Sequence, residues 1–196
     1  VLEGLAPLSD AWRELVAFAA GYYQRALGEL ALAALPPQLR ELSSTQLARR
    51  LKASASKPRD TNAGNAAENS PDFIALSDQQ TLALAEFDSK PGPFLLFGAT
   101  GSGKTEVYLH AVAALLARDA HAQALVMVPE INLTPQLEAR FRARFAPRYG
   151  DGSVVSMHSG MTPPQRLKSW LAAHSGAARI VLGTRMAVFA SMPGLK

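Results

Sequence analysis

The sequence contains no cysteine, and this absence excludes disulfide bonds and thiolate metal sites within its 196 residues. The four histidines lie far apart and lack the spacing of a metal site. No apolar run approaches the roughly 20 residues that cross a bilayer, and no basic segment followed by an apolar one opens the chain. We therefore expect a cytoplasmic protein that does not enter a membrane.

Charge is also sparse, because Asp, Glu, Lys and Arg together make up only 18% of the chain. Lys and Arg outnumber Asp and Glu by 20 to 16, which gives a net charge of +4. This mildly basic balance permits a polyanion partner such as DNA but does not require one. A hydrophobic content of 48% is enough for a core, and the length suits one domain with a small piece of another.

The first part of the chain, residues 1–42, has the pattern of helices. Ser9 or Asp10 can cap a helix whose apolar residues recur on one face. We expect Gly28 to break this helix and the Pro36-Pro37 pair to stop whatever follows.

The second part, residues 43–72, predicts a flexible linker. It opens with "SSTQLARRLKA", a candidate short helix capped by Ser43 or Ser44. The stretch from Ser54 to Asp72 is rich in Ser, Asn, Ala and Pro, so it buries too little apolar surface to offset its ordering entropy.

The third part, residues 73–196, alternates between short apolar strands and amphipathic helices. This order predicts an α/β fold, a parallel sheet covered by helices on both faces, with ligands beyond the carboxyl ends of its strands. The expected strands are 94–98, 123–130, 153–159 and 178–184, and the expected helices are 104–118, 134–145 and 162–174.

A glycine-rich segment, "GATGSGKT", joins the first expected strand to the first helix of this part. It matches the phosphate-binding pattern G-x-x-x-x-G-K-[ST] at every fixed position. Glycines allow successive backbone N–H groups to point inward, and the helix adds its dipole. Lys104 would reach the β- and γ-phosphates, and the Thr105 hydroxyl would ligate Mg²⁺. The candidate ATP-binding residues are Gly98, Ala99, Thr100, Gly101, Ser102, Gly103, Lys104, Thr105 and Glu106.

Two glutamines, Gln79 and Gln80, precede the loop by about 20 residues. Either side chain could bond the edge of adenine, which would favour ATP. They could equally be two exposed residues in the first turn of a helix that Ser77 caps.

Candidate functional residues stand at or just after the carboxyl ends of the remaining three expected strands. They are Pro129, Glu130 and Thr134 after the first, His158 and Ser159 after the second, and Gly183, Thr184 and Arg185 after the third. Each group alone is a weak signal, but the carboxyl ends of parallel strands share one edge of a sheet, so we expect them to lie together.

The strings "GATGSGKTEVYL", "MVPEINLTPQ", "HSGMTPPQRLKSWL" and "IVLGTRMAVF" closely resemble the first helicase lobe of the primosomal protein N′ (PriA) family. These are superfamily 2 DNA helicases of replication restart, whose lobe is a RecA-like P-loop NTPase fold. "YYQRALGELALAALPPQLR" resembles the end of that family's N-terminal 3′-DNA-binding domain. The resemblance thus implies three parts: the end of that domain (1–42), a linker with a winged-helix remnant (43–72) and a truncated first lobe (73–196).

The resemblance also implies roles for single residues. Gln80 would correspond to the adenine-recognising glutamine, and Lys104 and Thr105 would serve catalysis. Pro129, Glu130, Thr184 and Arg185 would contact DNA phosphates without reading sequence. Implied partners are branched or single-stranded DNA, other replication-restart proteins and single-strand-binding protein.

Several features of the family are absent from this sequence. Its Asp-Glu-x-His motif, second lobe and zinc-binding cysteines do not occur, so we expect a fragment that binds ATP weakly and hydrolyses it negligibly. The P-loop alone is compatible with two other classes of protein. A P-loop kinase or GTPase is disfavoured because an Arg-rich lid and a guanine-reading N-K-x-D are missing. A non-catalytic nucleotide- or DNA-binding module stays open.

The aromatic pair Tyr22-Tyr23 has two interpretations. Stacking on a DNA base is one. Packing in the core at the end of a helix is the interpretation that we expect.

Overall fold

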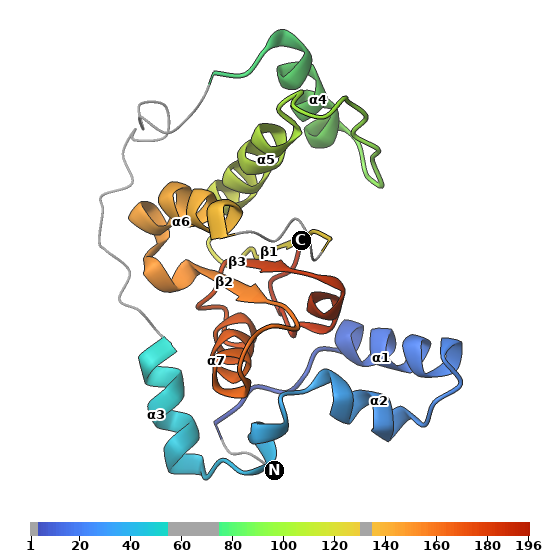
Figure 1. Cartoon of the computed structure of the whole chain (residues 1–196), viewed down its shortest axis with the longest axis vertical. Coiled ribbons are helices and arrows are strands. Elements are labelled where there is room, and N and C mark those ends of the chain that lie inside the picture. The colour runs from blue at the N-terminus through green and yellow to red at the C-terminus, as the bar shows by residue number, and fades with distance from the viewer. Residues whose placement is uncertain (1–3, 55–74, 130–134) are drawn as a thin grey trace. The chain divides into compact units, whose positions relative to one another are not determined.

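The computed structural model describes residues 4–54, 75–129 and 135–196 (Figure 1). The chain divides into two compact units. One comprises Val1–Arg59 with His121–Lys196, and the other comprises Asp60–Ala120. The predicted flexible stretch after Ser54 lies outside the described residues.

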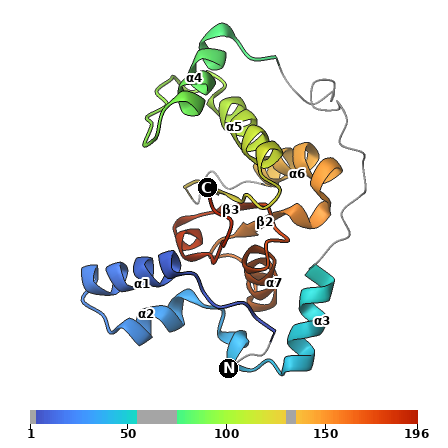
Figure 2. The same ribbon diagram turned by 180° about the vertical axis from the view of Figure 1, so that it is seen from behind.

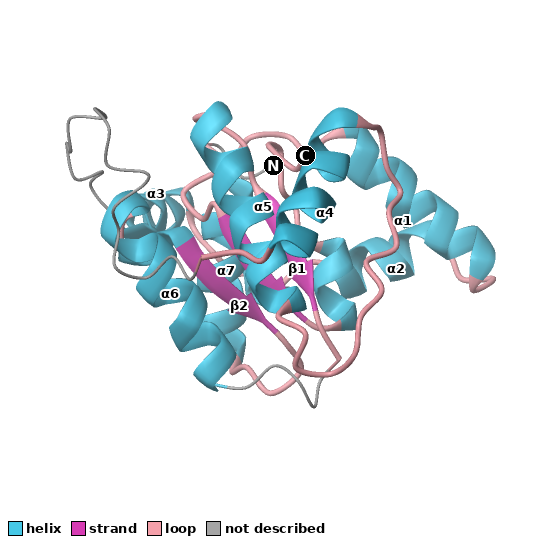
Figure 3. Cartoon of the chain, turned by 90° about the horizontal axis from the view of Figure 1, so that it is seen from above, coloured by secondary structure: helices cyan, strands magenta, loops and turns pink. Residues whose placement is uncertain are grey.

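The first unit is built on a three-stranded parallel sheet of β1 (Ala124–Met127), β2 (Val154–Met157) and β3 (Ile180–Gly183), in the order β1-β3-β2 (Figure 3). The strands pair in register, so that Met127 and Met157 both lie opposite Gly183. All four residues of β3 are buried, as expected for a central strand. The predicted α/β fold is confirmed, with strands shorter than the sequence suggested.

Two helices, α6 (Pro135–Tyr149) and α7 (Pro163–His174), pack against β2 from opposite faces of the sheet (Figure 1). Thr162 caps α7 in a reciprocal capping box with Gln165, and proline opens the helix as predicted. The predicted cap of α6, Thr134, lies outside the described residues. Two single turns, η3 (Asp151–Ser153) and η4 (Arg185–Phe189), flank the strands.

The N-terminal residues form α1 (Asp10–Tyr22) and α2 (Leu27–Ala34), which lie side by side (Figures 1 and 2). The Ser9 hydroxyl caps α1 by accepting from the Trp12 N–H. The predicted break at Gly28 is wrong, because the chain turns earlier, at Gln24, whose φ is 52°. A helix commonly ends with one residue in the left-handed region, and this residue is usually glycine. Here Gln24 takes that conformation instead.

A single turn, η1 (Pro37–Arg40), and a further helix, α3 (Ser44–Ser54), complete the N-terminal part. The predicted helix at α3 is confirmed, and Ser43 exchanges hydrogen bonds with Gln46 at its start. Leu39 and Leu47 are buried in the same hydrophobic cluster as Trp170 of α7. The division of the sequence at residues 42 and 72 stays a prediction, since the N-terminal helices share a core with the sheet.

Two hydrogen bonds, one from Trp12 and one from His174, connect the N-terminal residues to the C-terminal part of the chain. Trp12 Nε1 donates to the Phe189 carbonyl over 2.8 Å. His174 bonds the Ala6 carbonyl through Nε2 over 2.9 Å and the Ser191 hydroxyl through Nδ1 over 2.8 Å. The first unit is therefore assembled by contacts between residues far apart in sequence.

The predicted burial of the tyrosine pair is wrong. Tyr22 is 71% exposed and Tyr23 is 63% exposed at the end of α1. Their rings contact each other edge to face, with centroids 5.0 Å apart. Helix α1 buries Trp12, Val16, Ala19 and Ala20 instead, so the buried face of its last turn is formed by two alanines and not by the tyrosines.

The second unit contains α4 (Asp78–Ser89) and α5 (Lys104–Arg118), which pack together and are joined by an ion pair between Asp88 and Arg118. The predicted strand at 94–98 is wrong. This segment pairs with no strand among the described residues, and Leu95 and Phe97 are 90% and 93% exposed. A strand needs a partner for its backbone N–H and C=O groups, and apolar character alone does not supply one.

Candidate functional site

The glycine-rich segment forms a loop that leads directly into α5. Gly101 and Gly103 have φ values of +83° and +79°, in the left-handed region that other residues rarely adopt. Gly103 caps α5 and has no side chain to accept from the first helical N–H groups. The Glu106 N–H donates to the Gly103 carbonyl over 2.9 Å. The N–H groups of Lys104 and Thr105 and the positive end of the helix dipole are available to an anion, as in a phosphate-binding loop.

The ammonium group of Lys104 lies in the curve of this loop. Its Nζ donates to the carbonyls of Gly98 and Ala99 over 2.6 and 2.7 Å. A Cβ at Gly98 would lie 2.7 Å from the Ser102 hydroxyl oxygen, so a larger residue at this position would have to displace the Ser102 side chain. The loop thus holds a cation at the position where a phosphate group would need one.

Gln80 connects α4 to the loop. Its side-chain carbonyl accepts from the Ser77 N–H over 2.9 Å, in a capping box. Its Nε2 donates to the carbonyls of Ser102 and Gly103 over 3.2 and 3.4 Å. Gln79 is exposed and forms no such bond within the described residues. The helix-cap interpretation therefore holds for Gln80, whose side chain also contacts the loop. Recognition of adenine by Gln80 stays a prediction.

Thr105 and Glu106 continue from the loop into α5. The Thr105 hydroxyl forms no hydrogen bond within the described residues, which leaves it available to a metal-bound nucleotide. Glu106 is buried, and its carboxylate lies 3.7 Å from Nε2 of His110, one turn further along the helix. The donor set of Lys104, Thr105 and the loop N–H groups fits a triphosphate with Mg²⁺.

The carboxyl ends of the three strands form one edge in the first unit. The Val128 N–H donates to the Gly183 carbonyl over 2.9 Å, and the Thr184 N–H donates to the Met157 carbonyl over 3.1 Å. The structure therefore brings Pro129, His158 and Arg185 to this sheet edge, as the sequence predicts. Glu130 lies outside the described residues.

Thr184 and Arg185 differ in exposure although they are adjacent. Arg185 is exposed at the start of η4, whereas Thr184 is 1% exposed and its hydroxyl is buried without a partner among the described residues. The turn between them and β3 is tight, because a Cβ at Gly183 would lie 2.1 Å from Cβ of Ala187. Of this pair, Arg185 is the one whose side chain is accessible from solvent.

One cationic side chain beside this edge was missed in the sequence. Arg166, in the first turns of α7, lines the same pocket as His158 and Arg185. The signal was the capped, proline-initiated start of α7 in "TPPQR", which places a helix beginning just after the strand end. Spacing alone gave no reason to associate Arg166 with Arg185.

Comparison with known proteins identifies the family. Residues 77–194 match the family of DEAD/DEAH box helicases. The chain belongs to the DEAD/DEAH box helicase family. Members of this helicase family use ATP with Mg²⁺, in agreement with the donor set of the loop.

The chain is also similar to proteins named replication restart protein PriA. It is 42% identical over 129 residues to that of Haemophilus influenzae and 43% identical over 127 residues to that of Bacillus subtilis, covering 65% and 62% of the chain. The match to the Treponema pallidum protein is 34% identical over 178 residues, covering 90% of the chain, so it includes part of the N-terminal segment. The resemblance drawn from the motifs is confirmed.

The chain spans only 17%, 15% and 24% of the length of these three relatives. It therefore corresponds to one stretch of a helicase of this family. No helix in the described part of the chain is long and apolar enough to cross a membrane.

Proposed function

We propose that the chain forms part of the first lobe of an ATP-dependent DNA helicase that translocates on branched DNA during replication restart and primosome assembly. The observation that carries this proposal is the preformed loop around Lys104, in a chain whose relatives are named replication restart proteins. A loop that already surrounds a cation needs little rearrangement to accept the phosphates of ATP.

In this proposal the loop residues hold the nucleotide. Lys104 exchanges its bonds to Gly98 and Ala99 for bonds to phosphate oxygens, and the N–H groups at the start of α5 donate to the same phosphates. The Thr105 hydroxyl ligates Mg²⁺, which neutralises charge on the β- and γ-phosphates when bound. Gln80, held beside the loop by its bonds to Ser102 and Gly103, recognises the adenine.

The sheet edge holds the DNA. Arg185 donates to phosphate oxygens, and backbone groups near Pro129, Glu130 and Thr184 follow the same strand. Contacts to phosphate carry no sequence information, so binding is independent of sequence and weakens as salt rises. The buried Thr184 contributes through its backbone position in the turn rather than through an exposed hydroxyl.

The proposal extends to partners and location. Single-strand-binding protein and other replication-restart proteins would act with the whole protein, in the cytoplasm. Zinc would bind to cysteines outside these 196 residues, since this sequence has none.

Nucleotide binding tests the loop. We expect a fluorescent ATP analogue with Mg²⁺ to bind the chain weakly and Lys104→Ala to weaken it by about 10- to 100-fold, because a charge-assisted contact to phosphate is lost. Lys168→Ala is the matched control, since Lys168 is an exposed lysine of α7 far from the loop in sequence. Equal affinity of the wild type and the Lys104→Ala variant would contradict the assignment of the loop.

DNA-stimulated ATP hydrolysis tests the activity of the chain alone. We expect negligible turnover, because catalytic acids and an arginine finger of the family do not occur in this sequence. A turnover of about one per second that Lys104→Ala abolishes would show that the chain is a complete enzyme.

A further inference from the structure

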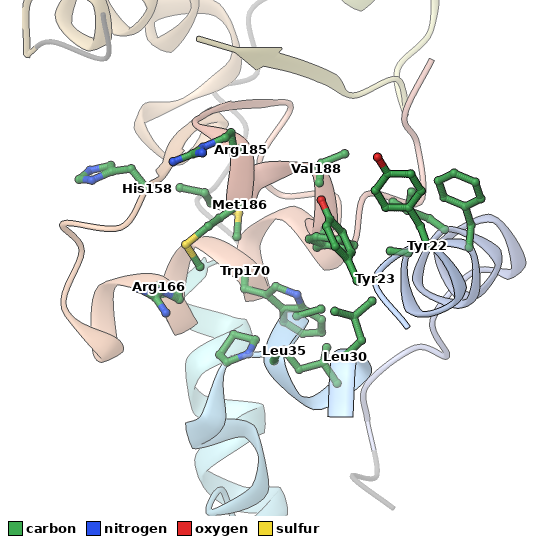
Figure 4. Close-up of a pocket in the computed structure, with 18 residues that line it drawn as sticks. Tyr22, Tyr23, Leu30, Leu35, His158, Arg166, Trp170, Arg185, Met186 and Val188 are labelled. Carbon is green, nitrogen blue, oxygen red and sulfur yellow. The ribbon is translucent and has the colours of Figure 1, made fainter. Parts of the chain in front are cut away.

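A pocket of about 710 Å³ opens beside Arg185, between the N-terminal helices and η4 (Figure 4). Its volume lies in the range of pockets that hold a small organic ligand. One wall comes from α1 and α2, and the other comes from η4 and the start of α7. Residues that form it lie more than a hundred positions apart, so the sequence gave no sign of it.

The two ends of the pocket differ in chemistry. Arg166, Arg185 and His158 lie at one end, and the pair Tyr22 and Tyr23 lies at the other (Figure 4). Within the described residues neither guanidinium has a hydrogen-bonding or ion-pair partner. No Asp or Glu lines the pocket. The charged end is therefore complementary to an anion.

The aromatic end is exposed rather than packed. Tyr23 is 63% exposed, and its ring is held by the edge-to-face contact with Tyr22. Between the two ends, Leu30, Leu35 and Trp170 supply apolar surface (Figure 4). An exposed aromatic ring above an apolar floor is the arrangement on which an unpaired nucleic-acid base stacks.

The floor of the pocket also contains an unsatisfied donor. Trp170 is 1% exposed, and its Nε1 has no acceptor among the described residues. A buried N–H without an acceptor is unfavourable. Because this nitrogen is closed off from solvent, it is not counted among the contacts to a ligand.

We propose that this pocket holds an unpaired base of single-stranded DNA whose phosphates run along the edge at Arg185. The proposal rests on the proposed function, because it assigns a base-stacking position to the strand that Arg185 contacts. Arg166 and Arg185 bind the flanking phosphates, and Tyr23 stacks on the base. In this arrangement the N-terminal helices bind the same DNA strand as the sheet edge.

The test compares a short oligothymidine with an abasic oligonucleotide of the same length, by fluorescence anisotropy on the full chain. We expect the wild type to bind oligothymidine more tightly. Tyr23→Ala should weaken oligothymidine binding by about 5- to 100-fold and leave abasic binding unchanged, because only stacking is lost. Tyr23→Phe keeps the ring and should bind like the wild type. Tyr23 is exposed, so these variants should fold normally.

Arg185→Ala separates this inference from the proposed function. It should weaken both oligonucleotides, because it removes a phosphate contact. If Arg185→Ala has this effect while Tyr23→Ala weakens neither oligonucleotide or both equally, DNA binding stands and the base pocket is overturned. If the wild type binds neither oligonucleotide, the pocket and the DNA-binding edge both fail.

Two further measurements locate the base. A 5-iododeoxyuridine oligonucleotide, irradiated while bound, should crosslink to Tyr23 or Trp170, and a crosslink confined to other segments would overturn the proposal. A peptide with acidic and aromatic residues offers negative charge and aromatic rings, as a DNA strand does. Binding of such a peptide that is tighter than that of oligothymidine and lost in Tyr23→Ala would assign the pocket to a protein partner instead.

Discussion

The phosphate-binding loop and the pocket beside Arg185 are built from the chain in opposite ways. The loop is local: Lys104 bonds Gly98 and Ala99, only a few residues away. The pocket is closed by segments far apart in sequence, such as the end of α1 and η4. A local site can be recognised from a sequence motif because adjacent residues determine its geometry. A site built from distant segments cannot be recognised in this way, because its residues come together only when the chain folds.

The largest expected effect is on the stability of the first unit, which contains the pocket. Buried Gln123 donates to the Ala173 and Ala178 carbonyls over 2.8 and 2.7 Å and accepts from the Gly194 N–H over 2.9 Å. Gln123→Leu leaves all three groups unpaired, so we expect the free energy of unfolding to fall by about 3 kcal/mol. Urea denaturation followed by tryptophan fluorescence measures this, because both tryptophans, Trp12 and Trp170, belong to this unit.

Gln79→Leu is the matched control for that experiment, since Gln79 is exposed on α4. It should leave the unfolding midpoint unchanged within error. A Gln123→Leu variant as stable as the control would show that the first unit does not depend on this residue.

A smaller effect is expected when the local site is changed. A Cβ at Gly103 would lie 2.3 Å from Nε2 of Gln80, and the φ of +79° is unfavourable for alanine. Gly103→Ala should therefore weaken nucleotide binding by about 5- to 30-fold, equivalent to about 1–2 kcal/mol. The tryptophan-monitored unfolding transition should not change, because both tryptophans lie in the first unit and Gly103 lies in the second.

Gly28→Ala serves as the glycine control. A Cβ at Gly28 meets nothing within 4 Å, and the residue is the second of α2. We expect this variant to gain less than about 0.5 kcal/mol of stability, because the residue lies in the first turn, and to bind nucleotide like the wild type. Loss of nucleotide binding in Gly28→Ala would contradict the view that the loop depends only on its neighbours.

The smallest effect concerns pH. Burial lowers the pKa of His174, and its hydrogen bond to the Ala6 carbonyl opposes the shift. A lowered pKa means that the unfolded chain binds the proton more readily, so the stability from this group is complete above about pH 6.5 and declines below it. The loss stays below about 1.4 kcal/mol per pH unit.

Urea denaturation at about pH 7.5 and about pH 5.5 should therefore show a larger drop for the wild type than for His174→Gln, which cannot titrate. The same drop in both proteins would place the pH dependence at another group.

Features that depend on adjacent residues were mostly predicted correctly, and features that depend on distant residues mostly were not. Helix starts were predicted at Ser9, Thr162 and Lys104 because caps and phosphate-binding loops depend on adjacent residues. The strand expected at 94–98 failed because pairing requires a distant partner, and nothing in "FLLFG" specifies one. The sheet edge was predicted from strand order alone.

Exposure of the tyrosine pair and the position of Arg166 could not be predicted for a related reason. Whether Tyr23 is buried depends on which residues pack against the end of α1, where Ala19 and Ala20 are buried and the tyrosines are not, and this is a property of the assembled unit. Arg166 becomes relevant only because α7 and η4 meet.

The hydrogen bond from Trp12 to the Phe189 carbonyl spans 177 positions of the chain. A ribosome adds about 5–20 residues per second, so Trp12 is synthesised roughly 9 to 35 s before its partner. During that interval the apolar face of α1 has no η4 to cover it. The first helix of the chain to be made is thus among the last to reach its final surroundings, and a chaperone that shields apolar surface would have most to do for this molecule while it is still being translated.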